Sequence, residues 1–266
     1  MAIKRTSTII RGGRLMDAAR HRISRVDILI EGDTIKEIGK PGMASPPGAT
    51  PFDARGKLMH PGLINAHTHG HGGLGKGMGD RWTLELLLTA GPWVNGNRTH
   101  EDKYLSTIIG AAEMVLKGCT ACYDLTVEFP VPSVEGLQAA GRAYQDIGMR
   151  AVVAPMVSDI SFFEAIPGLM GMLTPALRKD VERFKQAPHK TTLKSMRQAL
   201  RGLKLDHDRI RAAVAPTIPH HCSDAFLIAC RDLAREFGVG LHTHVAESKV
   251  QVIAGLRRYG MTLTAH

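Results

Sequence analysis

Hydrophobic and polar residues follow two different periods along this chain. Before residue 58 the apolar residues recur at every second position in short runs, as at Val26, Ile28 and Ile30, and a Gly-Asp pair at residues 32–33 separates this run from the next. Alternation of this kind predicts strands, and a Gly-Asp pair between two such runs is typical of a hairpin. Residues 1–57 therefore predict a small antiparallel β unit.

From residue 58 onward, short apolar runs alternate with longer stretches whose apolar residues lie three or four positions apart. The short runs predict strands at residues 63–66, 120–126, 151–157, 210–215, 239–245 and 261–266. The longer stretches predict helices at residues 100–117, 134–147, 176–185, 192–201, 224–237 and 249–259. Strands that alternate with helices indicate a parallel sheet with crossover helices.

This pattern predicts an α/β fold of the TIM-type (β/α) barrel class. The barrel is incomplete, because six predicted strands are two fewer than a full barrel has. The change of pattern divides the chain into two domains, which are the N-terminal β part at residues 1–57 and the barrel at residues 58–266.

The composition narrows the class of protein. With 44% hydrophobic and 22% charged residues, the chain is typical of a folded, soluble protein. No apolar run approaches the roughly 18 residues that cross a bilayer, and no signal-peptide core follows Met1, so we expect a cytoplasmic protein without a membrane partner. The formal charge of +9 is spread over predicted helices without a basic tract, which argues against a nucleic-acid partner.

Two histidines follow the first strand of the predicted barrel. His67 and His69 are two residues apart, so in an extended chain both imidazoles point to one side. Gly70, Gly72 and Gly73 come next and allow the backbone to turn sharply beside a ligand. Taken alone, the pair is either half of a metal site or a histidine-rich loop.

A second group of candidate residues follows the fifth predicted strand. His242 and His244 share one side of that strand, and Glu247 comes directly after it. The carboxyl ends of barrel strands meet at one face, so His67, His69 and His244 are expected to converge there. Three imidazoles with a nearby acid are typical of a hydrolytic zinc site. His266 ends the sixth predicted strand and is a candidate for orienting water or stabilising an oxyanion.

Residues 61–69, residues 242–247 and the strand ending at His266 resemble the metal-dependent amidohydrolase superfamily. They are most similar to the branch that holds cytosine, guanine and S-adenosylhomocysteine deaminases and the triazine hydrolases. The N-terminal β unit resembles the small β-sandwich that flanks the barrel in that family. The resemblance implies metal ligands at His67, His69 and His244, a proton shuttle at Glu247 and a catalytic contact to water or substrate at His266.

The resemblance also bears on the cofactor and on the substrate. The strand at residues 210–215 has no lysine for a carbamylated bridge, so a single ion is expected, Zn²⁺ or alternatively Fe²⁺. Adenosine-type deaminases of this branch have a substrate-contacting histidine where this chain has Thr217. His220 and His221 are candidates for the same role, and His242 is a candidate for a residue that supports the ligands.

One part of the family pattern is missing. Family members have a metal-binding aspartate at the end of the eighth strand, and no aspartate follows Glu247 here. We expect that the 266 residues are an N-terminal fragment of a longer protein, with weak metal affinity and little turnover alone. The alternative is a chain that works without these parts.

The expected function is hydrolytic deamination of an aminated heterocycle of the purine, pyrimidine or triazine type. Hydrolysis of a cyclic amide or of a ring chloride at the same centre is the first alternative. A non-catalytic metal-binding fragment is the second. The expected partner is a small heterocyclic substrate, and assembly into a homo-oligomer is left open.

Overall fold

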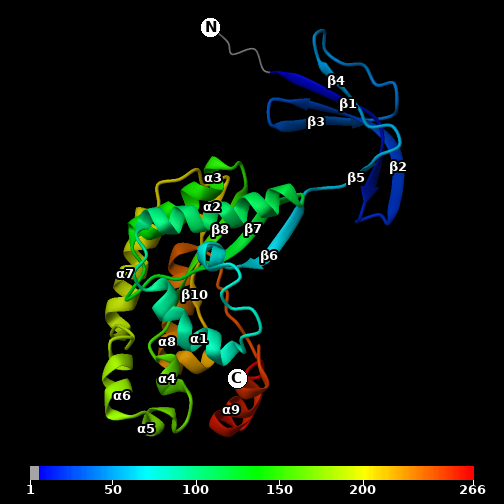
Figure 1. Cartoon of the computed structure of the whole chain (residues 1–266). Coiled ribbons are helices and arrows are strands. Elements are labelled where there is room, and N and C mark those ends of the chain that lie inside the picture. The colour runs from blue at the N-terminus through cyan, green and yellow to red at the C-terminus, as the bar shows by residue number, and fades with distance from the viewer. Residues whose placement is uncertain (1–5) are drawn as a thin grey trace. The chain divides into compact units, whose positions relative to one another are not determined.

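The computed structural model describes residues 6–266, which form two compact units that divide between Gly62 and Leu63 (Figure 1). Each unit has its own sheet, and the two are described separately. None of the helices in residues 6–266 has both the length and the hydropathy that a bilayer crossing requires.

The N-terminal unit is a five-stranded sheet. Its strands are β1 (Ser7–Asp17), β2 (Arg22–Glu31), β3 (Thr34–Gly39), β4 (Thr50–Asp53) and β5 (Leu58–Met59). The order is β3-β2-β1-β4, and β5 also pairs with β1. The antiparallel pairing of β1, β2 and β3 confirms the predicted hairpin pattern, whereas β4 and β5 run parallel to β1, which the sequence pattern did not indicate.

A buried carboxylate ties this sheet together. Asp27 is 1% exposed and accepts hydrogen bonds from Arg11 Nη1 at 2.7 Å, from Gly12 N at 2.8 Å and from Gly42 N at 2.9 Å. Burial by itself raises the pKa of Asp27, but these hydrogen bonds outweigh it and bring the pKa below its usual value of 3.8. The ionised form is therefore favoured in the folded unit.

The second unit is built on a parallel sheet. Its strands are β6 (Leu63–Thr68), β7 (Cys119–Thr126), β8 (Arg150–Val157), β9 (Ile210–Ala212) and β10 (Ala215–Pro216). The order is β10-β8-β7-β6, with β9 also paired to β8, and every pair is parallel. Within the described chain β6 is an edge strand, and its Ile64 is 73% exposed.

Nine α-helices and two 3₁₀ helices accompany this sheet within the described residues. They are η1 (Gly70–Gly75), α1 (Leu84–Asn95), α2 (His100–Leu116), α3 (Val134–Asp146), α4 (Phe162–Ala165), α5 (Leu169–Met172), α6 (Pro175–Glu182), α7 (His189–Gly202), η2 (Pro219–His221), α8 (Asp224–Phe237) and α9 (Lys249–Tyr259). Successive helices α2, α3, α7 and α8 each pack on the next (Figure 1). The core lies between them and the sheet, where Tyr144, Val153 and Ile210 are fully buried.

The helices that the sequence indicates most strongly have the expected ends. The Ser223 side chain caps α8 by accepting a hydrogen bond from Phe226 N, and Gly238 ends this helix with φ 62°. Gly260 ends α9 in the same left-handed conformation, with φ 68°. The short helices α4 and α5 and the helix α1 were not predicted from the sequence.

Three of the predicted strands differ from the structure. The strand at residues 210–215 is divided into β9 and β10, and residues 239–245 contribute a single bridge between Val214 and Leu241. The prediction of a strand at residues 261–266 was wrong. Thr262 instead forms a turn, because its carbonyl accepts from the amides of Ala265 and His266 and its hydroxyl accepts from Ala265. Such local hydrogen bonds compete with strand pairing.

Replacement of Asp27 by Asn is expected to lower the unfolding free energy of the N-terminal sheet by about 2 kcal/mol near neutral pH, because a charged hydrogen-bond acceptor is lost. Since the folded-state pKa is lowered, this stabilisation is present above pH 3.8 and disappears as the pH falls through the folded-state value. Hydrogen exchange of the Gly12 and Gly42 amides measures both effects. The exposed Asp53→Asn is the control and should leave this protection unchanged.

Candidate metal centre

Two histidines lie where β6 ends. His67 is the fifth residue of β6, and His69 is the first residue after the strand, directly following Thr68. A third histidine, His244, comes from the segment beside β10. This segment is held in place by hydrogen bonds from His242 N to Val214 O and from His244 N to Thr217 O, both at 3.0 Å.

The three imidazoles converge on one point. His69 Nε2 lies 3.2 Å from His67 Nε2 and 3.2 Å from His244 Nε2, and one nitrogen from each ring falls within 4.8 Å of the others. Zinc–nitrogen bonds of about 2.0–2.1 Å at tetrahedral angles separate ligand atoms by about 3.3–3.4 Å. The two separations of 3.2 Å are close to this value, so the three nitrogens could hold a divalent ion.

The opposite nitrogen of each ring is held by a partner. His69 Nδ1 donates to the Leu125 carbonyl at 2.9 Å, and His244 Nδ1 donates to the Thr217 carbonyl at 2.6 Å. His67 Nδ1 lies 3.2 Å from His242 Nε2. The two carbonyl partners fix the tautomers of His69 and His244, so the lone pairs of these two rings are at Nε2, where the three rings meet.

Burial favours the neutral form of the imidazoles of His67 and His69. It lowers the pKa of His69 to about 4, and it also lowers the pKa of His67, with a further contribution from His244. Burial likewise lowers the pKa of His242. Neutral rings are the form that binds metal, so the site presents lone pairs at physiological pH.

A buried carboxylate supports the turn after His69. Asp124 is fully buried on β7 and accepts hydrogen bonds from Gly70 N at 2.7 Å and from the Tyr144 hydroxyl at 2.9 Å. Burial raises the pKa of Asp124 to about 6. A side chain at residue 70 would place its Cβ 2.5 Å from Asp124 Oδ2, so glycine is required for this close approach.

Glu247 lies in the same region and follows a residue with an unusual backbone conformation. Ala246 has φ 57°, which is uncommon for a residue with a Cβ. The Glu247 side chain lies on the wall of the cavity described next, and its charge acts to raise the pKa of His67. The carboxylate is thus close to the imidazole cluster.

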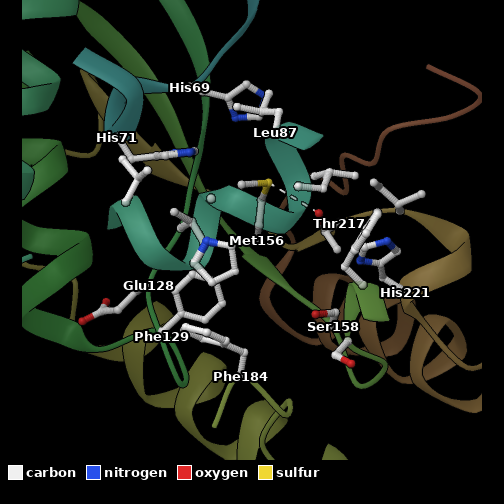
Figure 2. Close-up of a pocket in the computed structure, with 18 of the residues that line it drawn as sticks. His69, His71, Leu87, Glu128, Phe129, Met156, Ser158, Phe184, Thr217 and His221 are labelled. Atoms are coloured by element: carbon white, nitrogen blue, oxygen red, sulfur yellow. Dashed lines mark hydrogen bonds between the residues drawn. The ribbon is translucent and has the colours of Figure 1, made fainter. Parts of the chain in front are cut away.

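A cavity of about 400 Å³ opens beside the histidines, with His69, His244 and Glu247 on its wall. Figure 2 shows His69 and Thr217 among the residues that line it. Most of the remaining wall is apolar or aromatic, as at Trp82, Leu87, Phe129, Met156, Phe163 and Phe184. Its size and its mixture of apolar walls with a few polar groups are typical of a small-molecule site.

The structure separates the other sequence candidates into two groups. Thr217 and His221 line the cavity, and His242 contacts His67. His220 instead stacks on Tyr259, with 6.0 Å between ring centroids. His266 also lies on Tyr259, at 3.7 Å, and its Nε2 is 3.2 Å from Asp224 Oδ1, so the structure does not bring it to the imidazole cluster.

Sequence reasoning missed two residues of this region. Asp124 stands alone in an apolar strand, and only its position at the carboxyl end of β7 could have indicated it. His71 also lines the cavity, and it was not singled out because it lies in a glycine-rich stretch that predicts a loop.

The parallel sheet with three imidazoles at its carboxyl edge defines an α/β protein with a site for a divalent metal. Residues 58–264 match the model of the amidohydrolase family, and the chain belongs to this family. The resemblance drawn from the sequence motifs is thereby confirmed.

Relatives of known activity agree with this assignment. The chain is 29% identical over 266 residues to a 5-methylthioadenosine/S-adenosylhomocysteine deaminase of Symbiobacterium thermophilum, covering 97% of this chain and 53% of the deaminase. It is 28% identical over 260 residues to a 5'-deoxyadenosine deaminase of Methanothermobacter thermautotrophicus, covering 96% of this chain and 52% of the relative. The chain therefore spans about half the length of the relatives it matches.

Solved structures show the same fold. Atrazine chlorohydrolase TrzN from Arthrobacter aurescens TC1, complexed with zinc, superposes with a TM-score of 0.75 at 24% identity, over 97% of this chain and 57% of that one. An adenosine deaminase from Xanthomonas campestris with bound zinc gives a TM-score of 0.66 at 20% identity, over 98% of this chain and 54% of that one. These neighbours indicate a TIM-like α/β fold.

Replacement of His242 by Phe is expected to weaken zinc binding by about 10- to 100-fold, because His67 loses the partner that orients its ring. Phe retains a ring against Tyr123, which His242 contacts at 4.4 Å between centroids. Titration of zinc against a competing chelator measures the affinity. His244→Ala should bind more weakly still, and the exposed His207→Ala should match the unchanged protein. An unchanged affinity in His242→Phe would contradict a supporting role for His242.

Proposed function

We propose that this protein is a zinc-dependent hydrolase that removes an amino group from an uncharged nitrogen heterocycle. The observation that carries the proposal is the convergence of His67, His69 and His244 beside a cavity that also holds Glu247. An all-imidazole set with tetrahedral spacing suits Zn²⁺, and two structural neighbours contain zinc. We also propose that β6 to β10 belong to a TIM-type barrel and that the N-terminal sheet is part of a β-sandwich, as their likeness to these neighbours supports.

In this proposal His67, His69 and His244 hold the ion. A zinc ion in such a site lowers the pKa of a water ligand to about 7. The Leu125 and Thr217 carbonyls keep the ligand rings from rotating, so the reaction needs no rearrangement of the ligands.

Glu247 moves the protons. Its carboxylate accepts a proton from the attacking water and passes it to the leaving nitrogen, so that a C–O bond forms, the C–N bond breaks and ammonia departs. The left-handed turn at Ala246 sets the direction from which the carboxylate approaches. Thr217 and His221, which line the cavity, are proposed to contact the substrate.

The charges on the cavity wall support an uncharged substrate. Arg98 is engaged by the His71 carbonyl and by Ser106 Oγ, the latter at 3.2 Å. Glu128 pairs with Lys103 at 2.6 Å and accepts from Ser133 N at 2.9 Å. Burial raises the pKa of Glu128, but these contacts outweigh it and lower the pKa, so the Glu128 carboxylate stays ionised beside Lys103. A charged substituent placed against the apolar part of the wall, away from Arg98 and Glu247, would have no partner there.

Hydrolysis of a ring chloride is a second candidate function. The same centre would serve it, and the likeness to an atrazine chlorohydrolase together with the apolar cavity favours it over cyclic amide hydrolysis. Zinc-loaded protein incubated with 5'-deoxyadenosine, cytosine, melamine and atrazine separates the candidates. Ammonia release supports deamination and chloride release supports dechlorination. Bound zinc without either product would favour a non-catalytic metal-binding protein.

Glu247→Gln is expected to lower the turnover number by about 100- to 10,000-fold, because the amide cannot accept or return the proton. Zinc content should not change, since the three imidazoles remain. Ammonia release and elemental analysis measure the two quantities on the same preparation. Glu37→Gln, on β3 of the N-terminal unit, is the matched control and should retain full activity. Loss of less than about tenfold in Glu247→Gln would exclude Glu247 as the proton carrier.

The protein is expected to prefer 5'-deoxyadenosine to adenosine 5'-monophosphate by at least about 100-fold in kcat/KM, because the phosphate would be placed on an apolar wall without a partner. Competition between the two compounds for ammonia release measures the ratio. Equal use of both would show that the cavity accepts charged substituents.

A further inference from the structure

Glu85 lies in the first turn of α1 and takes no part in the metal centre or in the proton transfer proposed above. Its carboxylate oxygen Oε1 accepts a hydrogen bond from the Ser248 hydroxyl at 2.6 Å, although the two residues are 163 positions apart in the chain. This distance is typical of a hydrogen bond from a hydroxyl to an ionised carboxylate, which is about twice as strong as one between neutral groups. Ser248 directly follows Glu247, so the contact joins α1 to the segment that carries the proposed proton carrier.

The Glu85 carboxylate is also held by its own helix. Hydrogen bonds from Ser248, from the Glu85 amide and from the Thr83 side chain lower the pKa of Glu85, and they outweigh the effect of its burial. Thr83 caps α1 as well, because its side chain accepts a hydrogen bond from Leu86 N. Glu85 is therefore ionised at neutral pH and is a fixed acceptor for the Ser248 hydroxyl.

Two further hydrogen bonds connect this contact to the backbone of Glu247. The Ser248 hydroxyl caps α9 by accepting a hydrogen bond from Gln251 N at 3.2 Å. The buried side chain of Gln251 accepts in turn from Glu247 N at 2.8 Å. The Glu247 amide is thus held by the first turn of α9, and this turn is held by Glu85.

The helix α1 also forms part of the cavity wall. Leu84, Leu87 and Leu88 line the cavity from this helix, and Leu87 is labelled in Figure 2. Glu85 belongs to the same helical turn as these leucines. One turn of α1 therefore provides both a part of the substrate cavity and the acceptor for Ser248.

We infer that Glu85 is a positioning residue for Glu247 and holds the proton carrier in place beside the cavity wall through Ser248 and Gln251. The inference rests on the proposed function for the role of Glu247. A proton carrier must lie within hydrogen-bond reach of the groups that exchange the proton, and a displacement of about 1 Å can lower the rate about 100-fold. The hydrogen bonds of Ser248 and Gln251 restrict the Glu247 backbone, so their loss would allow such a displacement.

Removal of the Glu85 carboxylate from the zinc-loaded full chain tests the inference. Glu85→Ala is expected to lower the protection of the Glu247 amide from hydrogen exchange by about tenfold or more. It should also lower kcat for ammonia release from 5'-deoxyadenosine by about 10- to 100-fold and change KM by less than about twofold, because the leucines of the cavity wall remain. Glu85→Gln keeps an oxygen that accepts from Ser248, so it should retain most of the protection and of the turnover.

A matched control separates this contact from the general effect of an acid in the first turn of a helix. Glu101 follows the capping residue Thr99 of α2 at the same distance at which Glu85 follows Thr83 in α1. Glu101→Ala should therefore leave the protection of the Glu247 amide and kcat unchanged. An effect equal to that of Glu85→Ala would overturn the inference.

Ser248→Asp is a second variant in case Glu85→Ala does not fold. Aspartate still caps α9, but its carboxylate repels Glu85 and cannot donate a hydrogen bond to it. The protection of the Glu247 amide and kcat should fall as in Glu85→Ala. The two changes combined should lower kcat no further than either alone, because they remove the same contact.

Full protection of the Glu247 amide in Glu85→Ala and in Ser248→Asp overturns the inference. An unchanged kcat with lost protection overturns it too, as does a Glu85→Gln variant as impaired as Glu85→Ala. Failure of the proposed function gives a different result. If the unchanged protein releases no ammonia, the deaminase proposal is refuted, whereas hydrogen exchange still decides whether Glu85 holds the backbone of Glu247.

Discussion

His67 Nε2 and His244 Nε2 each lie 3.2 Å from His69 Nε2, and lone pairs at this distance repel one another unless a cation lies between them. The other features of the site follow from this constraint. Backbone carbonyl oxygens accept hydrogen bonds from Nδ1 of His69 and of His244. Burial lowers the pKa of His69, so the ring of His69 is neutral at physiological pH. The imidazole nitrogens thus form a cluster that a divalent metal ion can occupy, and backbone carbonyls hold the rings of His69 and His244 in position.

The fold meets this constraint with little local structure. His67 and His69 share one side of an extended chain, and His244 is brought in by the hydrogen bonds that its segment makes beside β10. Asp124 then fixes Gly70, which turns the chain away from the ligands and into η1. These contacts join the site to residues on or next to the strands of the sheet, since Asp124 lies on β7 and Val214 and Thr217 flank β10.

Much of this could be predicted from the sequence. The two-residue spacing of His67 and His69 and the position of His244 after an apolar run are sufficient, because parallel strands end at one face. The sequence could not indicate that Thr262 would bond to its own neighbours and carry His266 to Asp224, since local hydrogen bonds and strand pairing compete closely. Nor could it indicate the left-handed conformation of Ala246, which an alanine adopts only when its surroundings impose it.

The positions of His69 and His244 in the sheet affect the folding equilibrium of the chain. His69 follows the edge strand β6, whereas His244 belongs to the segment beyond β10 at the other end of the sheet, 175 positions later. A metal ion bound to both His69 and His244 would cross-link two distant positions of the chain and hold the two ends of the sheet together. An ion that binds only the folded chain also shifts the folding equilibrium by mass action.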